Sequence, residues 1–188
     1  SRWITAPATR ARGHLLRAAC GAILVGTGTA LADNPSLTVR LPDDVVDRDP
    51  NPAPLRVVLG ERDLPAGAAV LDSAAPTLHL RHRDPARAVA ELHERGVRQV
   101  LLEGGPTLAA AFLRAGLVDR VVLHLAPALL GAGVTLGDFG VGTLVDAPRL
   151  TIRSVEHLAP DVIVVADLTN TTRTANHNTE EEAACSPA

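Results

Sequence analysis

Short apolar runs alternate with amphipathic segments over the first part of the chain. The apolar runs have the length of buried strands and cover residues 22–25, 55–59, 70–71, 77–80 and 97–102. Apolar side chains recur at helical spacing over residues 8–19, 86–95 and 106–116, and a glycine stands at or just after the end of each segment. Strands that alternate with helices predict a largely parallel sheet with helices on its faces.

The pattern changes after residue 120. Apolar runs at residues 121–126, 149–155 and 162–166 follow with no helical segment between them, and the glycine-rich stretch 130–142 has little periodicity. We therefore expect antiparallel pairing at the C-terminal end of the sheet. Residues 26–40 are rich in turn-forming residues, and residues 41–54 contain repeated prolines and aspartates, which is typical of a surface loop.

The length and hydrophobic content of the chain predict one domain. A chain of 188 residues with 46% hydrophobic residues can bury one sizeable core. Residues 169–188 have almost no apolar side chains, so we expect a domain over residues 1–168 followed by a disordered tail. Because the chain does not begin with methionine, we expect it to be part of a longer protein.

Composition and charge argue against several classes of partner. A net charge of -3 and an aromatic content of 2% give little attraction for nucleic acid and few surfaces for base stacking. No apolar run has membrane-spanning length and no signal peptide is recognisable, so we expect no membrane association and a cytoplasmic location. The two cysteines, Cys20 and Cys185, lack the spacing of a zinc site, and we expect no metal.

The stretch VLLEGGPTLAAAFL, residues 100–113, has the strongest chemical signal. A buried strand ends on Glu103 and passes into a helix through Gly104, Gly105 and Pro106. Free N–H groups and the helix dipole at such a junction suit an anion such as the pyrophosphate of a dinucleotide. A tight turn explains Gly-Gly-Pro equally well, but an acid at the end of an apolar strand needs a polar partner, which favours a ligand site.

A second glycine junction precedes it, in AILVGTGTALADNPSLTVR, residues 22–40. Leu31 stands where a dinucleotide fingerprint would have its third glycine, so the ordinary Rossmann interpretation fails. What remains is a polar segment with Thr29, Asp33 and Arg40, in which the arginine either binds phosphate or is a solvated surface residue.

Other catalytic chemistry has no support in the sequence. Hydrolase, kinase and zinc-deaminase motifs are absent: there is no G-x-S-x-G, no P-loop and no H-x-E paired with P-C-x-x-C. The histidines lack ligand spacing, and we expect them to be core or surface residues; they include His14, His79, His82, His93 and His124.

Several spaced motifs together resemble one enzyme family. SRWIT, LVGTGTALADNPSLTVR, LLEGGPTLAAAFL and VDRVVLHLAPALLGAG resemble, in order, the reductase domain of the bifunctional riboflavin-biosynthesis deaminase/reductase, over residues 1–168. The resemblance implies an α/β fold similar to dihydrofolate reductase. Such a fold has a mixed sheet, mostly parallel with an antiparallel C-terminal strand, and helices on both faces.

The resemblance also implies an activity. Enzymes of this family use NADPH to convert the ribose of 5-amino-6-(5-phosphoribosylamino)uracil, a phosphorylated ribosylaminopyrimidine, into ribitol. Carried over by motif, the substrate-binding residues are Ser1, Arg17, Leu37, Arg40 and Glu103, with the arginines on the phosphate. The cofactor-binding residues are Trp3, Thr29, Asp33, Gly105, Pro106, Thr107, Leu108, Ala109, Ala110 and Ala111. Asp33 or a bound water is the candidate proton donor. A homodimer and native fusion to an N-terminal zinc deaminase domain are further expectations.

The chain departs from the family pattern in two places. The family domain begins upstream of Ser1 with a strand that carries a lysine and a Ser-Leu-Asp-Gly turn, and this strand is missing here. Gly60-Glu61 replace an Asp-Ser pair near the cofactor, where an inward Glu61 would repel a 2′-phosphate unless Arg62 compensates. Two alternatives stay open: a pterin reductase similar to dihydrofolate reductase, and a nucleotide-binding remnant without catalysis.

Overall fold

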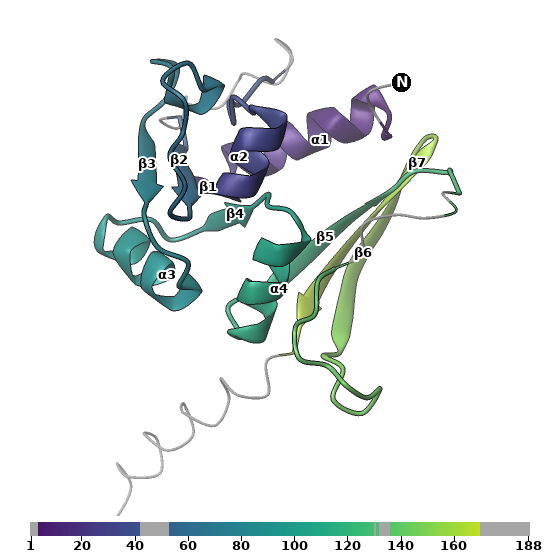
Figure 1. Cartoon of the computed structure of the whole chain (residues 1–188). Coiled ribbons are helices and arrows are strands. Elements are labelled where there is room, and N and C mark those ends of the chain that lie inside the picture. Colours follow the sequence, from purple (N-terminus) through teal and green to yellow (C-terminus); the bar gives the residue numbers. More distant parts are fainter. Residues whose placement is uncertain (1–3, 42–52, 130, 132–135, 170–188) are drawn as a thin grey trace, which may run out of the picture.

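Two sheets organise the part of the chain that the computed structural model describes, which is residues 4–41, 53–129, 131 and 136–169 (Figure 1). A four-stranded parallel sheet has the order β3-β2-β1-β4, and a three-stranded antiparallel sheet has the order β5-β7-β6. The strands are β1 (Ala22–Gly26), β2 (Leu55–Leu59), β3 (Thr77–Leu80), β4 (Val100–Leu102), β5 (Arg120–Leu125), β6 (Leu150–Leu158) and β7 (Asp161–Leu168). The helices are α1 (Pro7–Ala18), α2 (Thr27–Asp33), α3 (Pro85–Glu94) and α4 (Pro106–Arg114), with a short 3₁₀ helix, η2 (Ala69–Leu71).

The parallel sheet is buried on both faces, as its continuous apolar strands predict. On one face Leu24 of β1 belongs to the same core cluster as Phe112 of α4 and residues of α3. On the other face Ile23 packs in a cluster with Ala30 of α2 and residues of the η2 turn. Alternate β1 side chains therefore anchor helices on opposite sides of one sheet.

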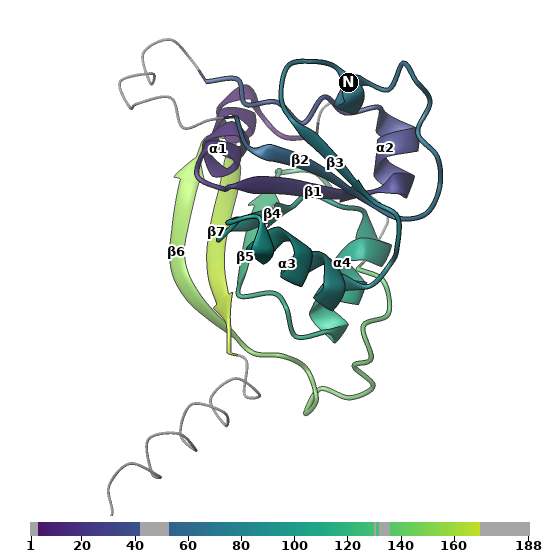
Figure 2. The ribbon, with the colours of Figure 1, turned by 90° about the vertical axis from the view of Figure 1, so that its left-hand side faces the viewer.

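The antiparallel sheet is joined to the rest by α1 (Figure 2). The carboxylate of Asp161, at the turn between β6 and β7, accepts a hydrogen bond of 2.7 Å from the amide of Ala6, which precedes the first residue of α1. The neighbouring Thr9 hydroxyl and the Ala6 amide lower the pKa of Asp161, so the charged form of this carboxylate is stabilised. Arg120 and Arg153 both bind Asp167, which ties β5, β7 and β6 together and lowers the pKa of Asp167 to about 2.

The fold class expected from the sequence is confirmed: an α/β protein with a mostly parallel sheet and helices on both faces. The antiparallel part is larger than expected, because its three strands form a sheet of their own. Most of the surface loop expected at residues 41–54 and most of the tail at 169–188 lie outside the described residues. In the ranges that are described, no helix is long and apolar enough to cross a membrane.

Three local expectations were wrong. Residues 27–33 form helix α2 rather than turns, because Thr27 and Ala30 are buried on one side of this short segment. The strand expected at residues 70–71 is the 3₁₀ helix η2, in which only Val70 is buried. The strand expected at 97–102 begins at Val100, because the amide of Val97 closes the end of α3 on the carbonyl of Leu92.

Arg56 is a fully buried cation inside β2 that sequence reasoning did not single out. Its guanidinium is 0% exposed and forms an ion pair of 2.7 Å with Asp72. It also donates to the backbone carbonyls of Ser36, Ala69, Asp72 and Ala75. One side chain thus fastens the segment after α2 and the segment around η2 to the same strand.

We expect Arg56→Met to lower the free energy of unfolding by about 3 kcal/mol, because several carbonyls would lose their donor together with the paired charge. Asp72→Asn is the matched control, since the Asp72 side chain is 48% exposed and its loss leaves the other Arg56 bonds in place. Urea unfolding of both variants measures the difference. Equal destabilisation by the two substitutions would contradict this account.

Candidate active-site cleft

A cleft of about 2130 Å³ lies between the β4 edge of the parallel sheet and the β5 edge of the antiparallel sheet. Residues 100–102 of β4 and 120–124 of β5 line its two sides. Polar side chains gather at the carboxyl end of β4, where open α/β sheets place their ligands. The members of this polar group are His14, Arg17, Asp33, Arg40 and Glu103.

The centre of this group is a bidentate ion pair between Arg17 and Glu103. The Arg17 Nε donates to Oε1 of Glu103 at 2.7 Å, and a terminal nitrogen of Arg17 donates to Oε2 at 2.6 Å. The other terminal nitrogen donates to the carbonyl of Thr38 at 2.9 Å. The two side chains are only 18% and 28% exposed, so solvent screens the pair weakly. The polar partner that Glu103 requires is therefore Arg17.

Arg17 and Arg40, the two arginines predicted to bind the phosphate, differ in their contacts. The guanidinium of Arg17 is engaged on all three nitrogens by Glu103 and Thr38. Among the described residues, no acid pairs with the guanidinium of Arg40, and Arg40 is exposed at the cleft. Within the polar group, Arg40 is therefore the cation that stays available to an anionic ligand.

His14 lies beside both arginines, and sequence reasoning missed it. Its Nδ1 accepts a hydrogen bond of 3.2 Å from the amide of Arg40. Burial, followed by the charges of Arg17 and Arg40, lowers the pKa of His14, so the ring is neutral at neutral pH. The available signal was its position three residues before Arg17, which puts both side chains on one face of a helix.

The segment after α2 has an unusual backbone. Asn34 and Leu37 have positive φ angles of 44° and 51°, which non-glycine residues rarely adopt and which occur preferentially at functional sites. The side-chain oxygen of Asn34 accepts a hydrogen bond from Ala69 at 2.7 Å. Leu37 is only 3% exposed and packs in the core with Ile23, so little of it can touch a ligand.

The turn between β4 and α4 is held by Thr29 of α2, whose hydroxyl accepts a hydrogen bond of 3.2 Å from the amide of Gly105. Gly104 is required for packing, because a Cβ there would lie 2.9 Å from Cβ of Leu108 and 2.3 Å from its Cδ2. A Cβ on Gly105 would meet only the Thr29 hydroxyl, at 3.7 Å. Of the α4 residues predicted to hold the cofactor, Thr107 is exposed, Ala109 lines the cleft and Ala110 is buried in the core.

Arg62 lies at the same edge of the parallel sheet, after β2. Its guanidinium is 3.3 Å from the position that a Cβ on Gly28 would occupy, which places it over the first turn of α2. The neighbouring acids bind other arginines: Glu61 pairs with Arg83 at 3.6 Å and Asp63 with Arg81 at 2.7 Å. No acid pairs with Arg62 in the described part of the chain.

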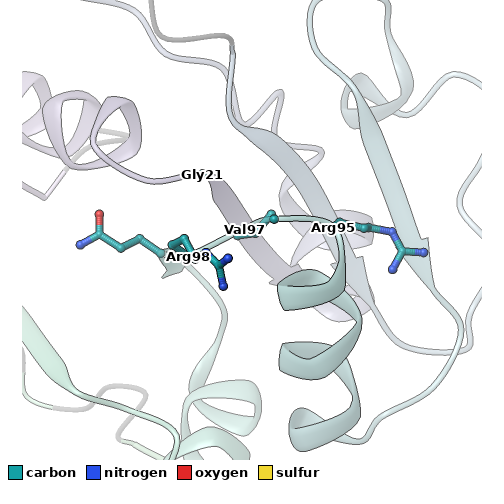
Figure 3. A pocket seen from close by; sticks show the side chains of 6 residues that line it. Gly21, Arg95, Val97 and Arg98 are labelled. Carbon is teal, nitrogen blue, oxygen red and sulfur yellow. The ribbon is translucent and has the colours of Figure 1, made fainter.

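A second concavity, of about 350 Å³, opens at the opposite ends of β1 and β4 and is lined by Gly21 and residues 95–99 (Figure 3). Its two cations are Arg95 and Arg98. Arg95 donates to the carbonyl of Glu91, and Arg98 contacts the ring of His93. Because both guanidinium groups are engaged by residues of α3, the larger cleft is the candidate site.

Comparison with known proteins identifies the family of the chain. The profile of the RibD C-terminal domain family matches residues 1–164. The chain belongs to this family. The family resemblance read from the sequence motifs is thereby confirmed.

Individual relatives of the RibD family give the same result. The riboflavin biosynthesis protein RibD of Mycobacterium tuberculosis is 47% identical over 165 residues, which is 87% of this chain and 47% of the relative. The 2,5-diamino-6-ribosylamino-4(3H)-pyrimidinone 5′-phosphate reductase of Methanothermobacter thermautotrophicus is 34% identical over 181 residues, which is 81% of this chain and 82% of the relative.

A solved structure from Thermotoga maritima aligns with a TM-score of 0.75 and 25% identity over 89% of this chain and 50% of that one. It is a diaminohydroxyphosphoribosylaminopyrimidine deaminase/5-amino-6-(5-phosphoribosylamino)uracil reductase. The chain spans about half the length of the first RibD relatives that it matches.

Most of the predicted site residues that the structure describes lie at the carboxyl edge of the parallel sheet. Asp33, Leu37 and Arg40 line the cleft together with Arg17 and Glu103. Thr29 and the glycine turn before α4 are joined by a hydrogen bond. Ser1 and Trp3 lie outside the described residues. The ligand that each residue binds stays a prediction.

Proposed function

We propose that this domain reduces the ribose of 5-amino-6-(5-phosphoribosylamino)uracil to the ribityl form with NADPH, as a step of riboflavin biosynthesis. The observation that supports this most is the pairing of Glu103 with Arg17 beside Arg40, in one cleft at the end of β4; no acid among the described residues pairs with Arg40. Such a site offers an acidic acceptor for sugar or base groups next to a cation for a phosphate. Two relatives are named for phosphorylated ribosylaminopyrimidine substrates.

Each polar residue of the cleft has its own role in the proposed reaction. Arg40 binds the substrate phosphate, while Arg17 fixes the orientation of Glu103 so that its remaining lone pairs accept hydrogen bonds from the substrate. A bound nicotinamide supplies a hydride to C1 of the opened sugar. One proton must reach the substrate to balance that hydride, and Asp33, at the cleft, or a bound water is the candidate donor.

The residues at the carboxyl edge of the parallel sheet fit a phosphorylated dinucleotide. Thr29 and the glycine turn before α4 would hold its pyrophosphate, and Arg62 would bind the 2′-phosphate. Glu61 lies 3.6 Å from Arg83 at the surface, which reduces the repulsion that an inward carboxylate would cause. This arrangement favours NADPH over NADH.

The two alternatives are less well supported. A pterin substrate carries no phosphate and gives Arg40 no function. A nucleotide-binding remnant without catalysis would bind NADPH but never oxidise it, so the loss of NADPH absorbance with substrate distinguishes it from a reductase.

We further propose that residues 1–168 form the reductase domain, with a tail over 169–188, and that a strand upstream of Ser1 completes the sheet. Within the described residues, β4 pairs only with β1, and β5 pairs only with β7. Both free edges line the same cleft, so one added strand could bridge the two sheets. The family's position as a C-terminal domain and the two-part name of the Thermotoga maritima protein support native fusion to a zinc deaminase domain.

The proposed reaction is tested by mixing the protein with NADPH and enzymatically generated substrate and following the loss of NADPH absorbance. We expect turnover that falls about 100-fold in Glu103→Ala, because the acceptor at the sugar is lost. An N-terminally extended chain is assayed in parallel, and turnover by that chain alone would also support the added strand. Binding of NADPH without turnover by either chain would contradict the proposed substrate.

Cofactor preference gives a separate prediction. Arg62→Ala should weaken NADPH binding about tenfold and leave NADH binding unchanged, because only NADPH carries the 2′-phosphate. Arg87→Ala is the matched control, since Arg87 is an exposed arginine of α3 that pairs with Glu91. Calorimetric titration with each nucleotide measures both affinities, and equal losses for NADPH and NADH in Arg62→Ala would refute the assignment.

We also infer that the domain forms a homodimer through the antiparallel sheet. The strand register puts a row of apolar side chains on the sheet face away from α1. These residues are exposed in the single chain: Leu123, Leu125, Leu150, Ile152 and Val155, with Ile152 62% exposed. An apolar face of this kind favours a self-complementary contact. Light scattering should give a dimer for the native protein and a monomer for Ile152→Glu; a native monomer would contradict the inference.

A further inference from the structure

The segment 38–40 is held against α1 by two bonds that resemble those of a neighbouring strand. Arg17 donates to the carbonyl of Thr38 at 2.9 Å, and His14 accepts from the amide of Arg40 at 3.2 Å. In an extended chain the carbonyl of one residue and the amide two residues later point to the same side. His14 and Arg17 are three residues apart on one helix face, so together they satisfy both groups.

Arg17 and His14, the two α1 residues that hold segment 38–40, have different surroundings. Arg17 is also bound to Glu103, so it stays in place independently of the segment. His14 is the acceptor that fixes the amide of Arg40 itself, and Arg40 is the exposed cation to which the proposed function assigns the phosphate. A small displacement of this backbone would move the guanidinium away from its ligand.

Resting on the proposed function, we propose that neutral His14 is a positioning residue that holds Arg40 in place for the substrate phosphate. The imidazole acts through its Nδ1 lone pair, so a protonated ring would release the amide of Arg40. The charged groups that face His14 are Arg17 on α1, Arg40 on the adjacent segment and Glu103 after β4, with the backbone of Thr38 also in contact. The two cations and burial favour the neutral ring.

The test compares three variants of whichever chain turns over in the NADPH assay. His14→Ala should raise KM for the substrate about tenfold with little change in kcat, because the lost contact positions a binding group. His14→Asn should restore KM to within about threefold, because its side-chain oxygen can replace Nδ1 as an acceptor. Arg12→Ala is the matched control on the same helix, since Arg12 faces Glu156 at the surface.

The pH dependence gives a readout that a merely structural role would not change. As pH falls through the lowered pKa of His14, the native KM should rise more steeply than the KM of His14→Asn, in which the substrate phosphate still titrates but the ring does not. Competition by ribose 5-phosphate should weaken in parallel in His14→Ala, while NADPH affinity and thermal stability stay native.

An unchanged KM in His14→Ala would overturn the proposal, as would a His14→Asn variant as impaired as His14→Ala. A native protein that binds ribose 5-phosphate but never oxidises NADPH would instead refute the proposed reaction, and the ribose 5-phosphate affinities of the variants would still decide the role of His14.

Discussion

The ion pair between Arg17 and Glu103 is the interaction on which the site depends. An acid at the end of an apolar strand is costly to bury, and Arg17 satisfies it with two short, nearly parallel hydrogen bonds. The third nitrogen of the same guanidinium reaches Thr38. One side chain therefore connects α1, the carboxyl end of β4 and the segment that carries Arg40, three parts of the chain that are distant in sequence.

Other polar contacts also hold the segment after α2. Arg56 donates to the carbonyl of Ser36, and the side chain of Asn34 accepts from the amide of Ala69. These two hydrogen bonds hold the backbone around Asn34 and Leu37, which have positive φ angles. Thr29 joins α2 to the turn before α4. Because these contacts lie at the carboxyl edge of the parallel sheet, the rigid strands bring a predicted substrate site and a predicted cofactor site side by side.

The sequence was sufficient to predict the α/β class and a polar partner for Glu103, because apolar periodicity and an acid at a strand end are local signals. The sequence was insufficient to predict α2, because this short helix is stabilised by the tertiary burial of Thr27 and Ala30. The partner of Glu103 comes from a helix 86 positions away, and the buried Arg56 looked like any strand residue. Gly104 was expected to leave space for a phosphate, but the side chain of Leu108 occupies the space beside it.

A double-mutant cycle on Arg17→Met and Glu103→Gln tests most directly whether this ion pair organises the site. Urea unfolding would give the free energy of unfolding for the native protein, both single variants and the double variant. The account predicts strong coupling, in which the double variant is more stable than the sum of the single losses implies, by at least about 1 kcal/mol. Additive losses would contradict the central role of the pair.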